Sequence, residues 1–152
     1  MLTVNELMTV NPFTVTPETS LRRIIEVMNL EGCRHLPVVD NGRLVGIITD
    51  RDVRLVMNSP LVLSAAWPDD RLMDEIGAEG IMTADPVTVT PETLAAKAAK
   101  LLSIYKFGAL PVVANNDNGA KLLVGIVTVT DFLTYFQNSK AIITIDDEKV
   151  MS

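Results

Sequence analysis

Apolar residues recur every three or four positions in two long segments of the chain. The first stripe comprises Leu21, Ile24, Ile25 and Met28, and the second comprises Leu94, Ala98, Leu101, Leu102 and Tyr105. This spacing predicts two amphipathic helices, each with one buried face. Thr-Pro-Glu precedes each stripe, at 16–18 and at 90–92, which is typical of an N-cap, a first-turn proline and a first-turn acid. We therefore expect the helices to begin at these tripeptides.

Two short apolar runs follow each predicted helix. Residues 36–39 and 44–48 are joined by Asp40-Asn41-Gly42, which predicts an antiparallel hairpin with a tight turn. Residues 110–113 and 122–127 predict a looser hairpin of the same kind.

A second helix is expected after each hairpin, beginning near Asp50 and near Thr130. Thr14-Val15 and Thr88-Val89 mark a short strand ahead of each first helix. The order of elements is therefore β-α-β-β-α, given twice, and the fold class is mixed α/β (α+β).

An internal repeat accounts for the doubled order. Residues 8–19 read MTVNPFTVTPET and residues 82–93 read MTADPVTVTPET, so nine of twelve positions match. A Leu-Pro-Val-Val motif returns with the same offset of 74, and a Leu-Val-Gly-Ile motif returns with an offset of 79. The five additional residues fall in the Asn-, Asp- and Gly-rich stretch 114–121, where a longer turn between two strands costs little.

The repeat divides the chain into a first unit over 1–57, a structured linker over 58–76, a second unit over 77–137 and a tail over 138–152. In the linker, Ser59-Pro60 and Trp67-Pro68 precede a short helix expected over 71–76. The tail holds a modest apolar segment at 141–145 that can fray or pack on a neighbour.

Composition narrows the function classes. A chain of 152 residues that is 48% hydrophobic can bury a core in one or two compact units. The net charge of -6 argues against binding to nucleic acid or to an anionic membrane surface. We see neither an export signal nor a membrane anchor. A lone cysteine, Cys33, is expected as core filler and fits a reducing compartment, so the cytoplasm is the expected location.

The usual catalytic patterns are missing from the sequence. It contains no phosphate-binding G-x-x-x-x-G-K loop, no G-x-S-x-G turn and no histidine cluster. Metal-ligand spacing is also missing, so we expect no metal, no required cofactor and no enzymatic activity.

An M-T-x-x-P-x-T-V start, an L-P-V-V strand and a G-I-I/V-T-x-x-D ending occur twice, over about residues 3–57 and 77–137. In this combination the chain resembles the CBS-domain family. The resemblance implies two repeats packed through their sheets with pseudo-twofold symmetry, an arrangement called a Bateman module. It also implies a homodimer of modules, and adenosine ligands such as AMP, ADP, ATP or S-adenosylmethionine in the two clefts between the repeats.

Two residue pairs are the main candidates for ligand binding: Thr49 with Asp52, and Thr128 with Asp131. Each pair lies three residues apart at a strand-to-helix junction, so the hydroxyl and the carboxylate can share one side of the first turn. Such a carboxylate suits a ribose diol, and the hydroxyl with nearby N–H groups suits a phosphate. The same aspartates can instead serve only to stabilise the helix N-termini. The duplication within the family pattern favours the ligand-binding reading.

The two clefts are expected to differ in charge. Arg34, His35, Arg51 and Arg54 surround the first pair and are candidates for phosphate binding. The second pair has Thr130, Leu133, Gly108 and Ala109 at the corresponding positions, with only Lys106 nearby. The Asp52 cleft should therefore prefer phosphorylated ligands.

The adenine-pocket candidates rest on the resemblance alone. They are Thr14, Val15, Leu36 and Pro37 in the first repeat and Thr88, Val89, Leu110 and Pro111 in the second.

The expected function is a non-enzymatic module that senses AMP, ADP or ATP and transmits its state to a separate, unidentified partner protein. A sensor of S-adenosylmethionine and a ligand-free structural dimerisation module remain alternatives.

Overall fold

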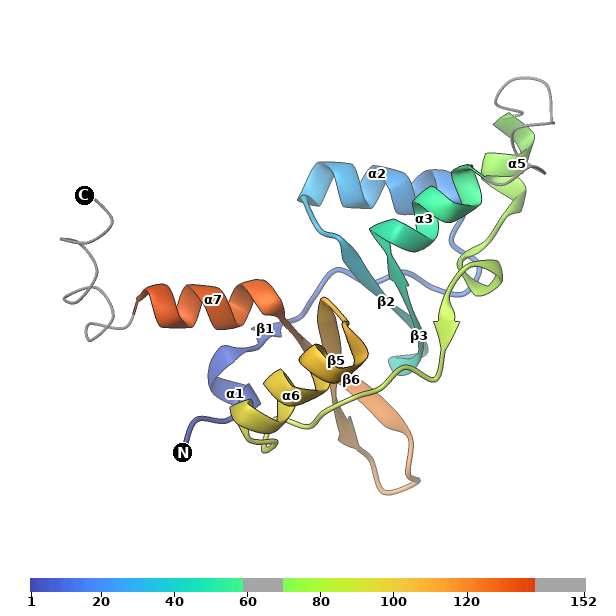
Figure 1. Cartoon of the computed structure of the whole chain (residues 1–152). Helices are drawn as coiled ribbons and strands as arrows, with labels where there is room; N and C mark the ends of the chain where they lie inside the picture. The colour runs from blue at the N-terminus through green and yellow to red at the C-terminus, as the bar shows by residue number, and fades with distance from the viewer. Residues whose placement is uncertain (59–69, 139–152) are drawn as a thin grey trace, which may run out of the picture.

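The computed structural model describes residues 1–58 and 70–138, except the side chain of residue 70 (Figure 1). The first half contains α1 (Val4–Leu7), β1 (Thr9–Val10), α2 (Leu21–Glu31), β2 (His35–Asp40), β3 (Arg43–Thr49) and α3 (Asp50–Met57). Next come α5 (Asp70–Glu75) and a 3-10 turn, η1 (Ala78–Gly80). The second half contains β4 (Thr83–Ala84), α6 (Ala95–Tyr105), β5 (Ala109–Asn115), β6 (Lys121–Thr128) and α7 (Val129–Gln137). The mixed fold class is confirmed, and the order of elements is repeated in the two halves. The short first strands are β1 and β4, however, and the predicted strands at Thr14-Val15 and Thr88-Val89 are isolated bridges, from Val15 to Val38 and from Val89 to Val112.

Both predicted hairpins are present. Strands β2 and β3 are joined by a turn in which Asn41 and Gly42 have φ of 52° and 80°, the left-handed conformation that a tight hairpin turn requires. In the second half, β5 and β6 are each one residue longer than β2 and β3, and they are joined by residues 116–120, which contain much of the predicted insertion. Each hairpin has an irregularity at the same place, after Val38 and after Val112.

The two halves exchange their short first strands. Strand β1 pairs with β6 of the second half, and β4 pairs with β3 of the first, so six strands form one sheet. The registers are equivalent: Thr9 lies opposite Ile126, and Thr83 lies opposite Ile47. This reciprocity gives the packing its pseudo-twofold symmetry.

The hydrophobic cores are exchanged in the same way. Helix α2 packs on β2 and β3 in the first core, which is completed by Ala78, a residue that follows the linker. Helix α6 packs on β5 and β6 in the second core, which is completed by Val4 and Leu7 of α1. The first core is thus covered by the segment just before the second half, and the second core is covered by the segment at the start of the first half.

The predicted starts of the first helices are wrong. Helix α2 begins at Leu21 with Ser20 as its N-cap, and α6 begins at Ala95. Residues 16–19 form a turn instead, in which the Thr19 N–H donates to the Thr16 carbonyl (3.1 Å). The Pro17 carbonyl accepts from the Glu79 N–H (2.9 Å), as the Pro91 carbonyl accepts from the Asn5 N–H (2.9 Å). The Thr-Pro-Glu turns therefore serve to hold the exchanged segments.

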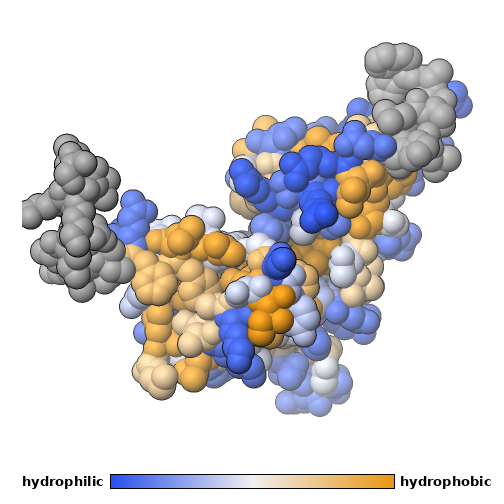
Figure 2. Space-filling model, viewed as in Figure 1, coloured by the Kyte–Doolittle hydropathy of each residue, from blue (hydrophilic) through white to orange (hydrophobic). Residues whose placement is uncertain are grey.

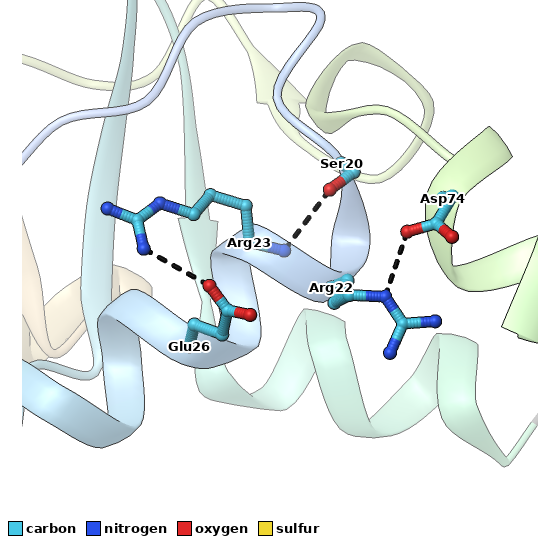
Figure 3. A network of polar contacts seen from close by, with 5 residues as sticks. All are labelled: Ser20, Arg22, Arg23, Glu26 and Asp74. Atoms are coloured by element: carbon cyan, nitrogen blue, oxygen red, sulfur yellow. Dashed lines mark hydrogen bonds and ion pairs between the residues drawn. The ribbon is translucent and has the colours of Figure 1, made fainter.

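The other predicted helices are confirmed within about one residue. Helices α3 and α7 begin at Asp50 and Val129, and the linker helix is α5. An ion pair between Arg22 Nε and Asp74 Oδ1 (2.8 Å) joins α5 to α2 (Figure 3). Ser59-Pro60, Trp67-Pro68 and the apolar tail segment 141–145 lie outside the described residues.

Glycine is required where the exchanged strands cross. A Cβ on Gly46 would lie 2.9 Å from Met82 Cγ and 3.0 Å from the Thr83 carbonyl oxygen, and one on Gly125 would lie 2.9 Å from both Met8 Sδ and the Thr9 carbonyl oxygen. A Cβ at either position would force the methionine side chain to move and would press against a carbonyl oxygen of the crossing strand.

We predict that Gly46→Ala lowers the free energy of unfolding by about 1–3 kcal/mol, the usual cost of overpacking. Gly80→Ala is the matched control, because nothing lies within 4 Å of a Cβ there, and it should change stability by less than about 0.5 kcal/mol. Urea denaturation of both variants measures the difference. Equal stability of Gly46→Ala and the wild type would contradict this account of the crossing.

Candidate functional site

Both candidate pairs form a reciprocal hydrogen-bonded cap at the start of a helix. The Thr49 N–H donates to Asp52 Oδ2 (2.9 Å), and the Asp52 N–H donates to Thr49 Oγ1 (3.1 Å). Thr128 and Asp131 repeat the arrangement at 2.8 and 3.1 Å. Helix stabilisation is therefore one role of these aspartates. The cap engages one oxygen of each carboxylate and leaves Oδ1 outside it.

Thr49 and Asp52 lie in a cleft of about 700 Å³ between the two halves, which we call the Asp52 cleft. The first half contributes the end of β3, the start of α3 and the start of β2. The second half contributes β4, the residues after it and the α6–β5 connection. The lining residues of the second half are Thr83, Asp85, Pro86, Val87, Tyr105, Lys106, Phe107, Gly108, Ala109 and Pro111.

The four candidates for phosphate binding line this same cleft. Arg34 and His35 come from the start of β2, and Arg51 and Arg54 come from α3. Arg54 Nη2 lies 3.7 Å from Asp50 Oδ2 in a long, exposed ion pair, which holds the guanidinium only weakly. The cleft thus combines the carboxylates of Asp50, Asp52 and Asp85 with several cationic side chains.

The Asp52 cleft also contains Lys106, Gly108 and Ala109. From their positions in the sequence we expected these residues to lie near Asp131. The reason is the exchange: the α6–β5 connection of the second half faces the α3 start of the first half. Sequence reasoning also missed Tyr105 and Phe107, whose rings stack with centroids 5.3 Å apart. The expected pseudo-twofold packing could have indicated these two residues, because it requires each cleft to be lined by both repeats.

The adenine-pocket candidates are mostly used in packing. The side chains of Val15 and Leu36 lie in the first core, and those of Val89 and Leu110 lie in the second. Thr14 is exposed, Thr88 is half-buried, and Pro37 is buried. Of this set, Pro111 lines the Asp52 cleft. A role of these residues toward an adenine stays a prediction.

The surroundings of Asp131 differ from those of Asp52. Thr130 and Leu133 on α7 stand where α3 has Arg51 and Arg54, and both are exposed. By the offset of 74, the counterparts of Tyr105, Lys106 and Phe107 are residues 31–33, which are Glu, Gly and Cys. The half-buried Cys33 also lines a separate groove between α2 and α3, and burial raises the pKa of its thiol. The two pairs therefore share one cap geometry but differ in the charge of the neighbouring side chains.

His35, the only histidine of the chain, is half-buried against the second half. Its Nε2 would lie 2.7 Å from a Cβ placed on Gly108, so the imidazole occupies the space that this glycine leaves. Burial lowers the pKa of His35; the nearby Asp50 opposes this shift and Arg34 adds to it. The imidazole is therefore neutral near pH 7.

Over residues 1–58 and 70–138, no group of three or more His, Cys, Asp or Glu side chains is placed to hold a metal ion. Within the same part of the chain, every helix is too short or too polar to cross a bilayer.

Known sequences give a consistent match. The family model described as CBS domain matches residues 4–59 and 78–138. A CBS domain-containing protein of Dictyostelium discoideum is 37% identical over 133 residues, covering 86% of this chain and 88% of that protein. An inosine-5′-monophosphate dehydrogenase of Korarchaeum cryptofilum is 34% identical over 135 residues. That match covers 89% of this chain but only 24% of the enzyme's length.

Solved structures match over nearly the whole chain. The structure of CBSX2 in complex with AMP has a TM-score of 0.71 and 30% identity, covering 89% of this chain and 96% of that one. The CBS domain pair of protein MJ0100, in complex with 5′-methylthioadenosine and S-adenosyl-L-methionine, has a TM-score of 0.71 and 27% identity, covering 92% and 99%.

We predict that His35 makes folding stability sensitive to mild acid. Because its pKa is lower in the folded chain than in the unfolded chain, the unfolded state binds more protons as the pH falls below about 6.5. The free energy of unfolding should therefore fall in that window, and His35→Gln should remove this part of the loss. Urea midpoints of both proteins between pH 5 and 8 provide the measurement. Parallel curves for the two proteins would show that His35 is not responsible.

Proposed function

Because the chain belongs to the CBS-domain family, we propose that it is a non-enzymatic regulatory module that binds an adenosine nucleotide in the Asp52 cleft. The observation that carries this proposal is the composition of the cleft: Asp52 lies together with Arg34, Arg51 and Arg54 between the two halves. We also propose that the module acts in the cytoplasm on a separate partner protein.

Each part of a nucleotide has a suitable partner in this cleft. The Oδ1 atom of Asp52 can accept hydrogen bonds from ribose hydroxyls while Oδ2 keeps the helix cap. The arginines can bind phosphate oxygens, and such charge-assisted hydrogen bonds are strong. Pro86 and Val87 offer apolar surface for the base. The similar protein CBSX2 was solved in complex with AMP, which supports an adenosine nucleotide as the ligand.

Binding between the halves provides a route to regulation. A nucleotide in the Asp52 cleft contacts residues of both halves, so it can favour one relative orientation over another. The ligand must bind the two orientations with different affinity, since equal affinity shifts no population. A partner protein would then read the orientation or the surface that it exposes.

S-adenosylmethionine is the main alternative ligand. Together with 5′-methylthioadenosine it is bound by the CBS pair of MJ0100. It carries no phosphate, whereas Arg34, Arg51 and Arg54 in the Asp52 cleft offer partners to a phosphorylated ligand. The surroundings of Asp131, where Thr130 and Leu133 replace two arginines, suit an uncharged or cationic adenosine compound better. A module that binds no ligand and serves only in dimerisation remains the structural alternative.

We propose no chemical step. Asp52 and Asp131 are engaged in helix caps, and a carboxylate that binds a ribose diol is remote from a scissile phosphate. The similarity to the dehydrogenase of Korarchaeum cryptofilum extends over only 24% of that enzyme. A nucleotide concentration that stays constant during incubation with pure protein is the expected result.

We predict that adenosine nucleotides stabilise the protein and that Asp52→Ala weakens their binding by about 1–3 kcal/mol, the cost of losing a buried hydrogen-bond partner. At ~100 times its dissociation constant, a ligand should raise the melting temperature by roughly 5–10 °C. The measurement is a thermal-shift panel of AMP, ADP, ATP, GTP, S-adenosylmethionine and 2′-deoxy-ATP, followed by calorimetry.

Asp131→Ala is the matched control, because it removes an equivalent helix cap. If only Asp131→Ala weakened ATP binding, the assignment to the Asp52 cleft would be wrong. If no ribonucleotide changed the melting temperature of the wild type, the structural alternative would be favoured.

We also propose that the module forms a homodimer through the apolar surface of its second half. Leu133, Phe136 and Val129 of α7 are 63%, 50% and 42% exposed, and Ile104 of α6 is 60% exposed. In Figure 2 hydrophobic colour gathers over this region, while the surface around α2 is mainly hydrophilic. A second copy would remove these side chains from water.

We predict that Leu133→Asp shifts the protein from dimer to monomer in size-exclusion chromatography with light scattering. A charge in an apolar interface is costly unless it is paired. Arg51→Asp on α3 tests whether any added acid has this effect, and it should leave the dimer intact. A monomeric wild type, or a dimer that persists in Leu133→Asp, would contradict this assignment of the interface.

A further inference from the structure

The end of helix α6 has an unusual residue for its backbone conformation. Lys106 follows the helix with φ of 58° and ψ of 37°, the left-handed conformation, and its N–H donates to the Leu102 carbonyl. Helices commonly end this way on glycine, because a Cβ is strained there. At the equivalent position of the first half, α2 ends on Gly32 with φ of 66° and ψ of 23°. The same turn is thus made by glycine in one half and by lysine in the other.

The difference in residue type coincides with a difference in surroundings. Lys106 lines the Asp52 cleft, across from Arg34, Arg51 and Arg54 of the first half. It is the cationic side chain that the second half contributes to that lining. A non-glycine residue in this strained conformation points to a role for its side chain at that place.

We propose that Lys106 is a specificity-determining residue, which makes the affinity of the Asp52 cleft for an adenosine ligand depend on the number of phosphates. This inference rests on the proposed nucleotide site. The ammonium group supplies a positive charge from the second half, and a longer phosphate chain anchored by the arginines of the first half can reach it. ATP and ADP therefore gain a contact that adenosine lacks. Because this contact joins the two halves, it also makes their relative orientation sensitive to phosphate number.

The experiment compares stability and binding in the same variants. Lys106→Gly should raise the melting temperature by about 2–4 °C, because it relieves the left-handed strain. It should nevertheless weaken ATP binding by about tenfold, the effect of losing one charge-assisted hydrogen bond. Lys106→Asn, which also tolerates the left-handed conformation, should lose affinity to the same degree. Lys106→Arg should retain wild-type affinity within about twofold. A residue with a purely structural role would not combine higher stability with weaker binding.

Adenosine, AMP, ADP and ATP are titrated calorimetrically in magnesium-free buffer. The loss in Lys106→Asn should grow from adenosine to ATP. Lys100→Gln is the matched control, since it removes an exposed lysine of the same helix outside the cleft, and it should leave all four affinities unchanged. Equal losses for adenosine and ATP, or unchanged ATP affinity in Lys106→Asn, would overturn this inference while leaving the nucleotide site intact. Failure of the wild type to bind any of the four would overturn the proposed function itself.

Discussion

The close crossing of the exchanged strands is the constraint on which the rest of the structure depends. Strands β1 and β4 can pair with the opposite hairpins only because Gly125 and Gly46 leave room for the methionines and carbonyls that pass over them. The pairing brings α1 and the segment after the linker onto the opposite cores. It also brings β4 and the α6–β5 connection beside α3, and this proximity forms the Asp52 cleft. Sheet, cores and cleft therefore share one geometric origin.

The aspartates at the helix starts serve both the stability of the helix and the proposed binding of a ligand. Asp52 and Asp131 close a hydrogen-bonded cap, which stabilises the helix with or without a ligand. That cap also fixes the direction of the carboxylate, so a ligand would meet an acceptor that is already oriented and loses little further entropy on binding. The same contact thus stabilises the helix start and orients the carboxylate for a ligand.

Much of the fold could be predicted from sequence because its signals are local. The Asn41-Gly42 turn, the paired apolar runs and the Thr-x-x-Asp helix starts act over a few residues. The starts of α2 and α6 could not be predicted this way, because the carbonyls of Pro17 and Pro91 are bonded to segments distant in sequence. The cleft shows the same contrast. The cations beside Asp52 in sequence were predicted, whereas Lys106 and Tyr105 reach it only through tertiary packing.

The reciprocal exchange also bears on how such a chain could arise by duplication. One repeat by itself would lack the strand that Thr83-Ala84 or Thr9-Val10 supplies, and its core would lack the cover that Ala78 or Val4 provides. An ancestor carrying a single repeat would have needed a second molecule to lend those residues. With both repeats in one chain, the exchange takes place within a molecule and does not depend on protein concentration. The pseudo-twofold sheet is the arrangement that two such single-repeat molecules would form by exchanging these strands.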